Sequence, residues 1–134
     1  MALQIQEREK EGIVILDVDG RLVVGEACSQ IRERIQAVAA SGRNRVILNL
    51  KEVSYVDSTG LGTLVICYTT LKKAGGELKL LNLSRRNIEL LVLTKLTTVF
   101  EIFTDEQDAV NSFFPNREIT RFDILSFVEG QSES

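Results

Sequence analysis

A carboxylate and two hydroxyl groups stand side by side at Asp57, Ser58 and Thr59, and Gly60 and Gly62 follow them closely. An apolar stripe begins directly after this group, so Asp57 occupies the position of an N-cap that accepts a hydrogen bond from a backbone N–H one turn further on. Ser58 is then the first helical residue, with its hydroxyl facing solvent. Because a helix N-terminus stabilises a dianion by about 0.3–1 kcal/mol, we expect the fold to tolerate a phosphate on Ser58.

The same residues also fit simpler interpretations. Asp-Ser-Thr ahead of an apolar stripe is typical of an ordinary helix start that has no function beyond the cap. Gly60 and Gly62 either leave the surface around Ser58 low, so that another protein can come close, or let the helix pack closely on a sheet. No Gly-Lys-Ser/Thr follows, so the segment is not a P-loop, and Gly-Leu-Gly alone is too weak a signal for a dinucleotide site.

The sequence contains no histidine, which excludes several classes of enzyme. A Ser-His-Asp triad, a Cys-His pair and a histidine phosphocarrier all need this residue. Cys28 and Cys67 are far apart, so there is no CxxC motif or Cys-rich zinc site, and both are interpreted as small buried hydrophobic residues. The sequence offers no convergent set of carboxylates or lysines as a general base. We expect a protein that is not an enzyme and needs neither a cofactor nor a metal ion.

Composition and charge favour an ordinary soluble globular protein. The 134 residues include 16 Lys and Arg against 19 Asp and Glu, and the net charge of −3 argues against a nucleic-acid partner. Residues 1–10 alternate apolar and charged side chains without a signal-peptide core. No apolar run approaches the roughly 20 residues of a membrane span. The sequence therefore predicts a cytoplasmic protein without a membrane partner.

Strand-like and helix-like segments alternate along the chain. The predicted strands are residues 3–5, 13–18, 46–50, 77–82 and 99–103, and the predicted helices are residues 25–40, 57–73, 84–93 and 104–113. Asp19-Gly20 is expected to end the second strand, and Thr104 with Gln107 matches a capping box for the last helix. The order β-β-α-β-α-β-α-β-α predicts an α/β fold, with a mixed, mostly parallel sheet of about five strands covered by about four helices.

The Asp57 to Gly62 segment joins the buried strand at residues 46–50 to the next helix. Such junctions lie at the carboxyl ends of parallel strands, where ligands and partners bind. Pro115 breaks the last helix, and residues 115–134 do not fit the alternation although many of them are apolar. We expect residues 1–114 to form a single domain and residues 115–134 to be an extension that packs on this domain or on a second subunit.

Residues 49–62 (Asn-Leu-Lys-Glu-Val-Ser-Tyr-Val-Asp-Ser-Thr-Gly-Leu-Gly) resemble the signature of the STAS domain family of bacterial anti-sigma factor antagonists. Residues 18–22 (Val-Asp-Gly-Arg-Leu) are similar to the second strand and turn of this family. Residues 75–80 (Gly-Gly-Glu-Leu-Lys-Leu) are similar to its helix exit and following strand. The resemblance covers residues 3–113, so it implies a STAS domain at residues 1–114.

The resemblance implies a regulatory protein that works by partner switching. In this family the unmodified antagonist binds a serine kinase that is also the anti-sigma factor, which frees the sigma factor. The kinase phosphorylates the serine after the motif aspartate, here Ser58, and a serine phosphatase resets it. Thr59 stands where many relatives have a second serine and is the alternative acceptor. The implied partner-binding residues are Asp57, Thr59, Gly60, Leu61 and Gly62, together with Asp19, Gly20 and Arg21 in a loop beside Ser58.

A second hypothesis assumes the same fold and a different partner protein. The same surface of a STAS domain can serve in a docking subunit of a transporter or another signalling complex that is not phosphorylated. The intact Asp57-Ser58 pair favours the antagonist. Residues 115–134 lie beyond the usual end of the domain, and a homodimer through this segment is a candidate role for it.

Overall fold

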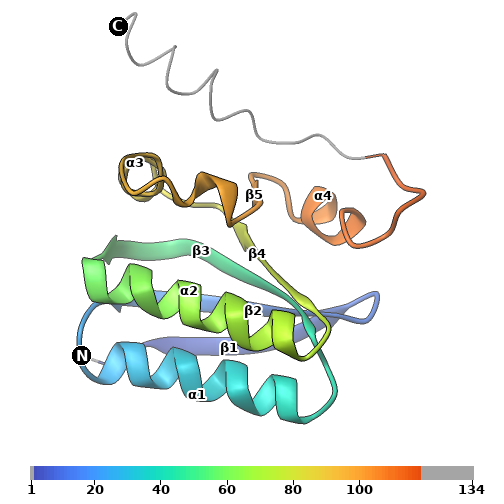
Figure 1. Cartoon of the computed structure of the whole chain (residues 1–134), viewed down its shortest axis with the longest axis horizontal. Helices are drawn as coiled ribbons and strands as arrows, with labels where there is room; N and C mark the ends of the chain where they lie inside the picture. Colours follow the sequence, from blue (N-terminus) through green and yellow to red (C-terminus); the bar gives the residue numbers. More distant parts are fainter. Residues whose placement is uncertain (1, 119–134) are drawn as a thin grey trace, which may run out of the picture.

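Within residues 2–118, which the computed structural model describes, five β-strands and four α-helices follow one another in the predicted order (Figure 1). The strands are β1 (Gln4–Lys10), β2 (Ile13–Leu22), β3 (Arg45–Val56), β4 (Glu77–Leu81) and β5 (Ile102–Phe103). The helices are α1 (Glu26–Ala40), α2 (Ser58–Lys73), α3 (Arg85–Leu93) and α4 (Glu106–Asn111), with a 3₁₀ turn, η1, at Leu96–Thr98. The predicted α/β fold is confirmed.

The strands form one mixed sheet in the order β1-β2-β3-β4-β5. β1 and β2 are antiparallel and are joined at Glu11 and Gly12, which both have a positive φ (54° and 81°), as a type I′ hairpin turn requires. The remaining neighbours, from β2 to β5, are parallel. The carboxyl ends of these four strands therefore lie at one edge of the sheet, which we call the carboxyl edge.

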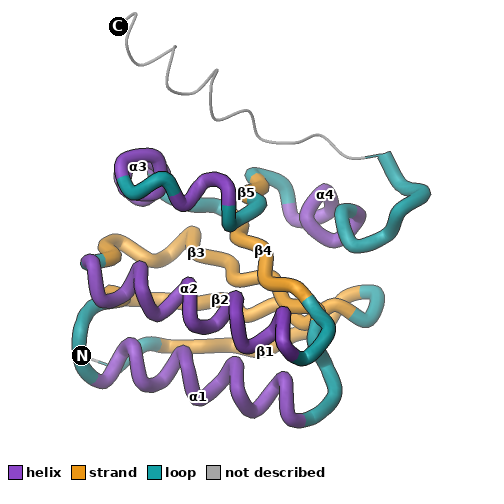
Figure 2. The backbone as a smooth tube through the Cα atoms, in the orientation of Figure 1, coloured by secondary structure: helices purple, strands orange, loops and turns teal. Residues whose placement is uncertain are grey.

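One face of the sheet carries the larger core, beneath α1 and α2. The two helices lie side by side across this face (Figure 2). Alternate strand residues point toward it, and the helices meet them with apolar residues three and four positions apart. Fully buried members of this core are Val14, Leu16, Val46, Leu48, Ile31, Ile35, Leu64 and Leu71. Both helices follow strands that end at the carboxyl edge, so both begin there.

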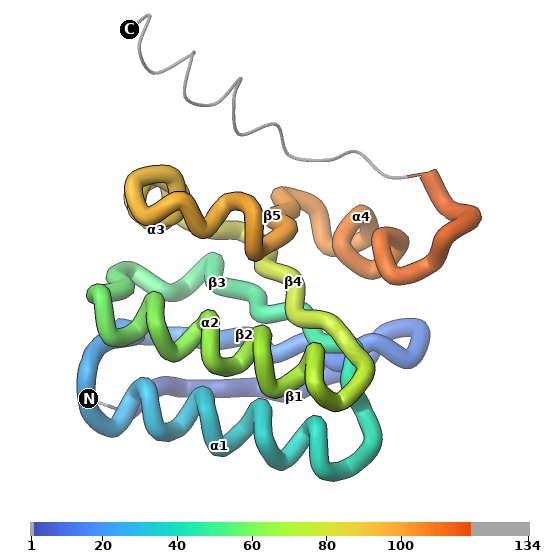
Figure 3. The backbone as a smooth tube through the Cα atoms, viewed as in Figure 1, coloured from blue at the N-terminus to red at the C-terminus, as the bar shows by residue number. Residues whose placement is uncertain are grey.

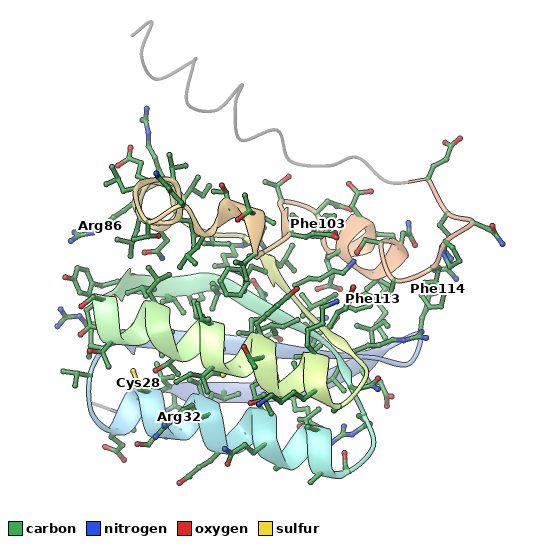
Figure 4. All side chains as sticks on the ribbon, viewed as in Figure 1. Cys28, Arg32, Arg86, Phe103, Phe113 and Phe114 are labelled. Carbon is green, nitrogen blue, oxygen red and sulfur yellow. The ribbon has the colours of Figure 1, made fainter. Side chains whose placement is uncertain are left out.

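The opposite face carries a smaller core beneath α4. It consists of Ile13, Ile15, Ile47, Leu81, Phe103, Ala109 and Val110, with the half-buried Phe113 and Phe114 packed against them (Figure 4). Lys79 points to the same face and is only 3% exposed. Its Nζ donates to the Ser112 hydroxyl at 2.8 Å and to the Ser112 carbonyl oxygen at 3.2 Å. Lys79 therefore satisfies acceptors at the end of α4 and holds this helix against the sheet.

Three strands extend further than the sequence predicts. β1 continues from the predicted end at residue 5 to Lys10. β2 continues through Asp19 and Gly20 to Leu22, so these residues do not end the strand, and β3 continues from the predicted end at Leu50 to Val56. The added residues of β2 and β3 pair with one another across register shifts. A shift places exposed side chains between buried ones, as at residues 51–52, and so breaks the alternation by which a strand is recognised in a sequence.

The last strand is shorter than predicted. Only Ile102–Phe103 pairs with β4, whereas the predicted strand began at residue 99. The backbone N–H groups of Val99 and Phe100 donate instead to the carbonyl oxygen of Leu96, in and directly after η1. Because these donors are used by the turn, the apolar residues before Ile102 do not extend the strand.

The last helix begins differently from the prediction. Its N-cap is Asp105, whose carboxylate accepts a hydrogen bond from the Asp108 backbone N–H at 3.0 Å, so the proposed capping box of Thr104 and Gln107 is wrong. Aspartate is the better N-cap, because its carboxylate also interacts favourably with the helix dipole. The helix ends at Asn111, two residues earlier than predicted.

Most of the predicted extension, residues 119–134, lies outside the described residues, and so does its candidate role in dimerisation. Arg117 makes an ion pair of 2.8 Å with Glu11 in the β1–β2 turn. The described chain therefore ends near the amino end of β2, far from the carboxyl edge. No helix in residues 2–118 combines the length and apolar character needed to cross a membrane.

The two glycines of α2 are expected to respond differently to alanine. A Cβ on Gly60 would overlap the Leu22 carbonyl group of β2, whereas a Cβ on Gly62 would meet nothing within 4 Å. We expect Gly60→Ala to lower the free energy of unfolding by about 2 kcal/mol or more. Gly62→Ala should leave it unchanged or raise it by up to about 1 kcal/mol, because alanine is the better helix former. Urea denaturation measures both, and equal stabilities would contradict the packing role of Gly60.

Candidate functional site

The start of α2 is held by Asp57, the residue that follows β3. Its carboxylate accepts hydrogen bonds from the backbone N–H of Gly60 at 2.7 Å and of Val24 at 3.0 Å. The first bond is the predicted N-cap, and the second reaches the loop between β2 and α1. The Asp57 backbone N–H donates to the Leu22 carbonyl oxygen at 3.2 Å. One residue therefore joins the ends of β2 and β3 to the starts of α1 and α2, which lie at the same end of the molecule (Figure 3).

The hydrogen bonds to Asp57 also keep its side chain charged. The N–H groups of Val24 and Gly60 stabilise the carboxylate more than the neutral carboxyl group, so they lower the pKa of Asp57 below its usual value. A negative charge at this position also interacts favourably with the dipole of α2. At neutral pH an ionised side chain therefore holds the turn before Ser58.

Ser58 and Thr59 are the first two residues of α2, and both are exposed. Neither hydroxyl makes a hydrogen bond to another described residue, since the contact of Thr59 with Thr63 uses its carbonyl oxygen as the acceptor, at 2.9 Å. Ser58 thus lies where the sequence predicts, at the first helical position and open to solvent. Both hydroxyls are accessible, and neither contributes to the fold.

The next three residues divide between the core and the surface. Gly60 lies against the Leu22 backbone. It therefore lets α2 pack closely on the sheet, which was one of the two roles that the sequence suggested for the glycines. The Leu61 side chain is only 6% exposed and belongs to the larger core. Gly62 is exposed, with open space above it, and fits the predicted low surface. Of these three predicted partner-binding residues, Gly62 alone is open to solvent.

Asp19, Gly20 and Arg21 lie within β2, which corrects the prediction that they form a loop. Gly20 has a φ of 131°, which residues with a side chain rarely adopt, and the register with β3 shifts next to it. The three residues are still near Ser58, because the next residue along the strand, Leu22, accepts the backbone N–H of Asp57. The structure therefore brings Arg21 close to the start of α2, on a strand rather than on a loop.

An open groove of about 480 Å³ lies between α1 and α2, directly beside Thr59. Its lining is mostly apolar and comes from Gly25, Cys28, Ser29, Arg32, Thr59, Gly62, Thr63 and Ile66, of which Cys28 and Arg32 are labelled on α1 in Figure 4. Ile66 is 47% exposed, and Val24 in the neighbouring loop is 68% exposed. An open, mostly apolar groove with an exposed isoleucine on its wall is a surface suited to contact with another protein.

Sequence reasoning did not identify this groove. Val24 precedes the predicted helix at residues 25–40. Ile66 lies outside the apolar stripe of its own predicted helix, which consists of Leu61, Leu64, Val65, Tyr68 and Leu71. These two apolar residues without a place in the predicted core were the available signal. The wall formed by α1 could not be inferred, because it depends on how α1 packs against α2.

Cys28 and Cys67 are buried, as predicted, and neither forms a disulfide. Burial raises the pKa of the Cys67 thiol to about 12, so this thiol stays protonated and is a poor nucleophile. No group of three or more Cys, Asp and Glu side chains in residues 2–118 is suited to hold a metal ion. The carboxyl edge instead presents an accessible serine beside an apolar groove.

Replacing Asp57 tests how the turn before Ser58 is held. Asp57→Ala removes both accepted hydrogen bonds and should lower the free energy of unfolding by about 0.5–2 kcal/mol at neutral pH. Because the folded pKa lies below the unfolded value of about 3.9, this contribution is present above that value and is lost as the pH falls through the folded pKa. Urea denaturation at several pH values should show the variant approaching the wild type in acid. A difference that does not change with pH would contradict an ionised cap.

Known proteins resemble this chain both in sequence and in fold. Residues 4–109 match the STAS domain family. The chain is 36% identical over 110 residues to the anti-sigma-B factor antagonist of Bacillus subtilis, which covers 82% of this chain and 99% of that protein. Among solved structures, an anti-sigma factor antagonist from Mycobacterium paratuberculosis gives a TM-score of 0.73 at 21% identity, covering 83% of this chain and 93% of the other. Bacillus SpoIIAA in its phosphorylated form gives 0.64 at 24% identity, covering 84% and 99%. The chain therefore belongs to the STAS domain family and, within it, to the anti-sigma factor antagonists.

Proposed function

We propose that the protein is an anti-sigma factor antagonist that switches partners through Ser58. The unphosphorylated protein binds a serine kinase that is also an anti-sigma factor, phosphorylation of Ser58 releases the protein, and a serine phosphatase resets it. The proposal depends on the Ser58 hydroxyl at the start of α2, which is exposed and makes no hydrogen bond to another described residue. The chain is also 36% identical to an anti-sigma-B factor antagonist. The protein acts by binding, and the chemistry at Ser58 is performed by its partners.

The surroundings of Ser58 support a phosphate that does not disturb the fold. A phosphoserine carries a charge of about −1.5 to −2 at pH 7. At the first position of α2 this charge meets the positive end of the helix dipole, which stabilises it by about 0.3–1 kcal/mol and offsets part of the repulsion from Asp57. The Ser58 hydroxyl has no partner to lose, and the side chain is already in solvent. The phosphorylated protein should therefore remain folded.

The groove beside Thr59 supports release through the interface. A partner that covers the groove and its exposed Ile66 removes water from this surface, and Ser58 directly precedes Thr59, which lines the groove. A phosphate there, next to the charged Asp57, places two negative groups against the partner. Juxtaposed like charges, or a buried charge without a partner, cost several kcal/mol, and each 1.4 kcal/mol lowers the affinity about tenfold.

Ser58 is expected to be the phosphate acceptor in the native host. Trypsin releases residues 52–72 as one peptide that contains both Ser58 and Thr59. Fragmentation mass spectrometry of protein isolated from growing and stressed cells should place the phosphoryl group on Ser58. Ser58→Ala should abolish the modification, and Thr59→Ala, the matched control, should keep it. A peptide that stays unmodified under all conditions would favour the docking subunit, and phosphate on Thr59 would contradict the assignment of the acceptor.

The switch is expected to act on binding and not on folding. Ser58→Asp should weaken binding to the anti-sigma factor kinase of the same host by at least about tenfold, or 1.4 kcal/mol. Its melting temperature should stay the same or rise slightly, because the new charge lies at a helix N-terminus. Thr69→Asp adds the same charge at an exposed position about 16 Å further along α2 and should bind normally.

Isothermal titration calorimetry with the kinase, together with thermal denaturation of each variant, measures both quantities. Equal losses of affinity in the two variants would show that net charge, and not its position at Ser58, controls binding. Unfolding of the Ser58→Asp variant would show that the charge acts on the fold, which is the opposite of the proposed switch.

A further inference from the structure

Two arginines share one tyrosine ring near the carboxyl edge. The guanidinium carbon of Arg86 lies 4.4 Å from the centroid of the Tyr55 ring, and that of Arg21 lies 5.2 Å from it. Tyr55 is half-buried near the end of β3, Arg21 is its partner on β2, and Arg86 comes from the first turn of α3. Figure 4 shows Arg86 at the end of the molecule where β3 ends and α2 begins. We call these three residues the arginine platform.

The positive charges of the arginine platform have no carboxylate partner in the described part of the chain. Neither Arg21 nor Arg86 forms an ion pair or donates a hydrogen bond there, although both are exposed. Other arginines of the same domain are paired with carboxylates, at 2.6 Å for Arg8 with Asp17 and for Arg43 with Glu7. The ring of Tyr55 holds the two guanidinium groups in place through contacts worth about 0.5–1 kcal/mol each. Their N–H donors remain directed to solvent.

Side chains alternate between the two faces along each strand, and this alternation places the arginine platform away from the face that α1, α2 and their groove cover. Leu22 and Val56 point into the larger core beneath those helices. Their neighbours Arg21 and Tyr55 therefore point away from that core. Ser58 belongs to the helix that covers the core, so the platform flanks Ser58 and does not face it.

The arginine platform is close enough to Ser58 for one partner protein to contact both. Tyr55 precedes Ser58 by three residues, which separates their Cα atoms by at most about 11 Å. A protein interface covers about 800 Å² on each partner, which corresponds to a patch of about 16 Å radius. A protein centred on Ser58 would therefore also cover the platform.

We propose that the arginine platform binds carboxylate groups of the protein that docks on the Ser58 face, an identification of the partner chemistry that rests on the proposed function. Guanidinium groups match carboxylates with two parallel hydrogen bonds, and a ring that restrains them lowers the entropy lost on binding. Paired charges of this kind raise the rate of association and select partners. The partner surface that meets β2 and α3 is therefore acidic, and the surface that meets the groove is apolar.

Hexaglutamate is a probe for this site that does not require the kinase. Titration of the ¹⁵N-labelled protein at low salt should shift the side-chain Nε–H signals of Arg21 and Arg86 in a saturable manner. The double variant with Arg21→Gln and Arg86→Gln should weaken binding by at least about fivefold. The double variant with Arg45→Gln and Arg85→Gln is the matched control, since it removes the same two charges from exposed residues outside the platform, at the start of β3 and beside Arg86. This control should change the affinity less than about twofold.

Equal weakening by the control and by the double variant of Arg21 and Arg86, or no saturable shift at the two arginines, would overturn the proposal. A second measurement excludes the phosphate of the same chain as the ligand. With phosphoserine incorporated at position 58, the side-chain Nε–H signals of Arg21 and Arg86 should stay close to their positions in the unmodified protein. A large downfield shift of these signals, as for a guanidinium N–H that donates to a phosphate, would assign the arginines to the phosphate and overturn the proposal. If Ser58 is never phosphorylated in the host, partner switching fails, while the hexaglutamate result still decides the platform.

Discussion

The close approach of α2 to the end of β2 is the constraint on which the site depends. The carbonyl oxygen of Leu22 accepts the backbone N–H of Asp57 and lies so close to Gly60 that only a residue without a side chain fits there. The carboxylate of Asp57 closes the same turn by binding Gly60 and Val24. Four backbone segments are thereby fixed around one point, and Ser58 is the residue that this arrangement holds at the surface. Its position is determined by contacts in which its own side chain takes no part.

This division of roles separates stability from regulation. Three residues hold the turn. Asp57 caps α2, Gly60 packs against the backbone of Leu22, and the Leu61 side chain is buried in the core. The hydroxyls of Ser58 and Thr59 form no bond within the described residues, so a group added to either does not break a contact of the fold. A charge that would be costly in the core is tolerated at the first turn of a helix. The same charge becomes costly only when a second protein removes the water around it.

The sequence predicted the element order and the position of Ser58 because both depend on local signals. Helical and strand periodicity and the N-cap at Asp57 act over a few residues, and each agreed with the fold. The predictions failed where pairing overrides the local pattern. β2 passes through Asp19-Gly20 because β3 pairs with it across a register shift, which no local pattern shows. The groove and the arginine platform could not be predicted for the same reason, since each combines residues from separate helices and strands.

The two surfaces beside Ser58 suggest why a single phosphate is sufficient to act as a switch. Tyr55 precedes Ser58 by three positions, so a partner that meets the arginine platform also brings its carboxylates into the interface that contains Ser58. A phosphate of charge near −2 repels these carboxylates, and the repulsion is strongest where the partner has removed water and salt from between the charges. The groups that attract the partner to Arg21 and Arg86 are therefore the ones that the phosphate repels. An acidic partner surface would make binding both selective before phosphorylation and sensitive to it, whereas a purely apolar contact in the groove would respond through desolvation alone.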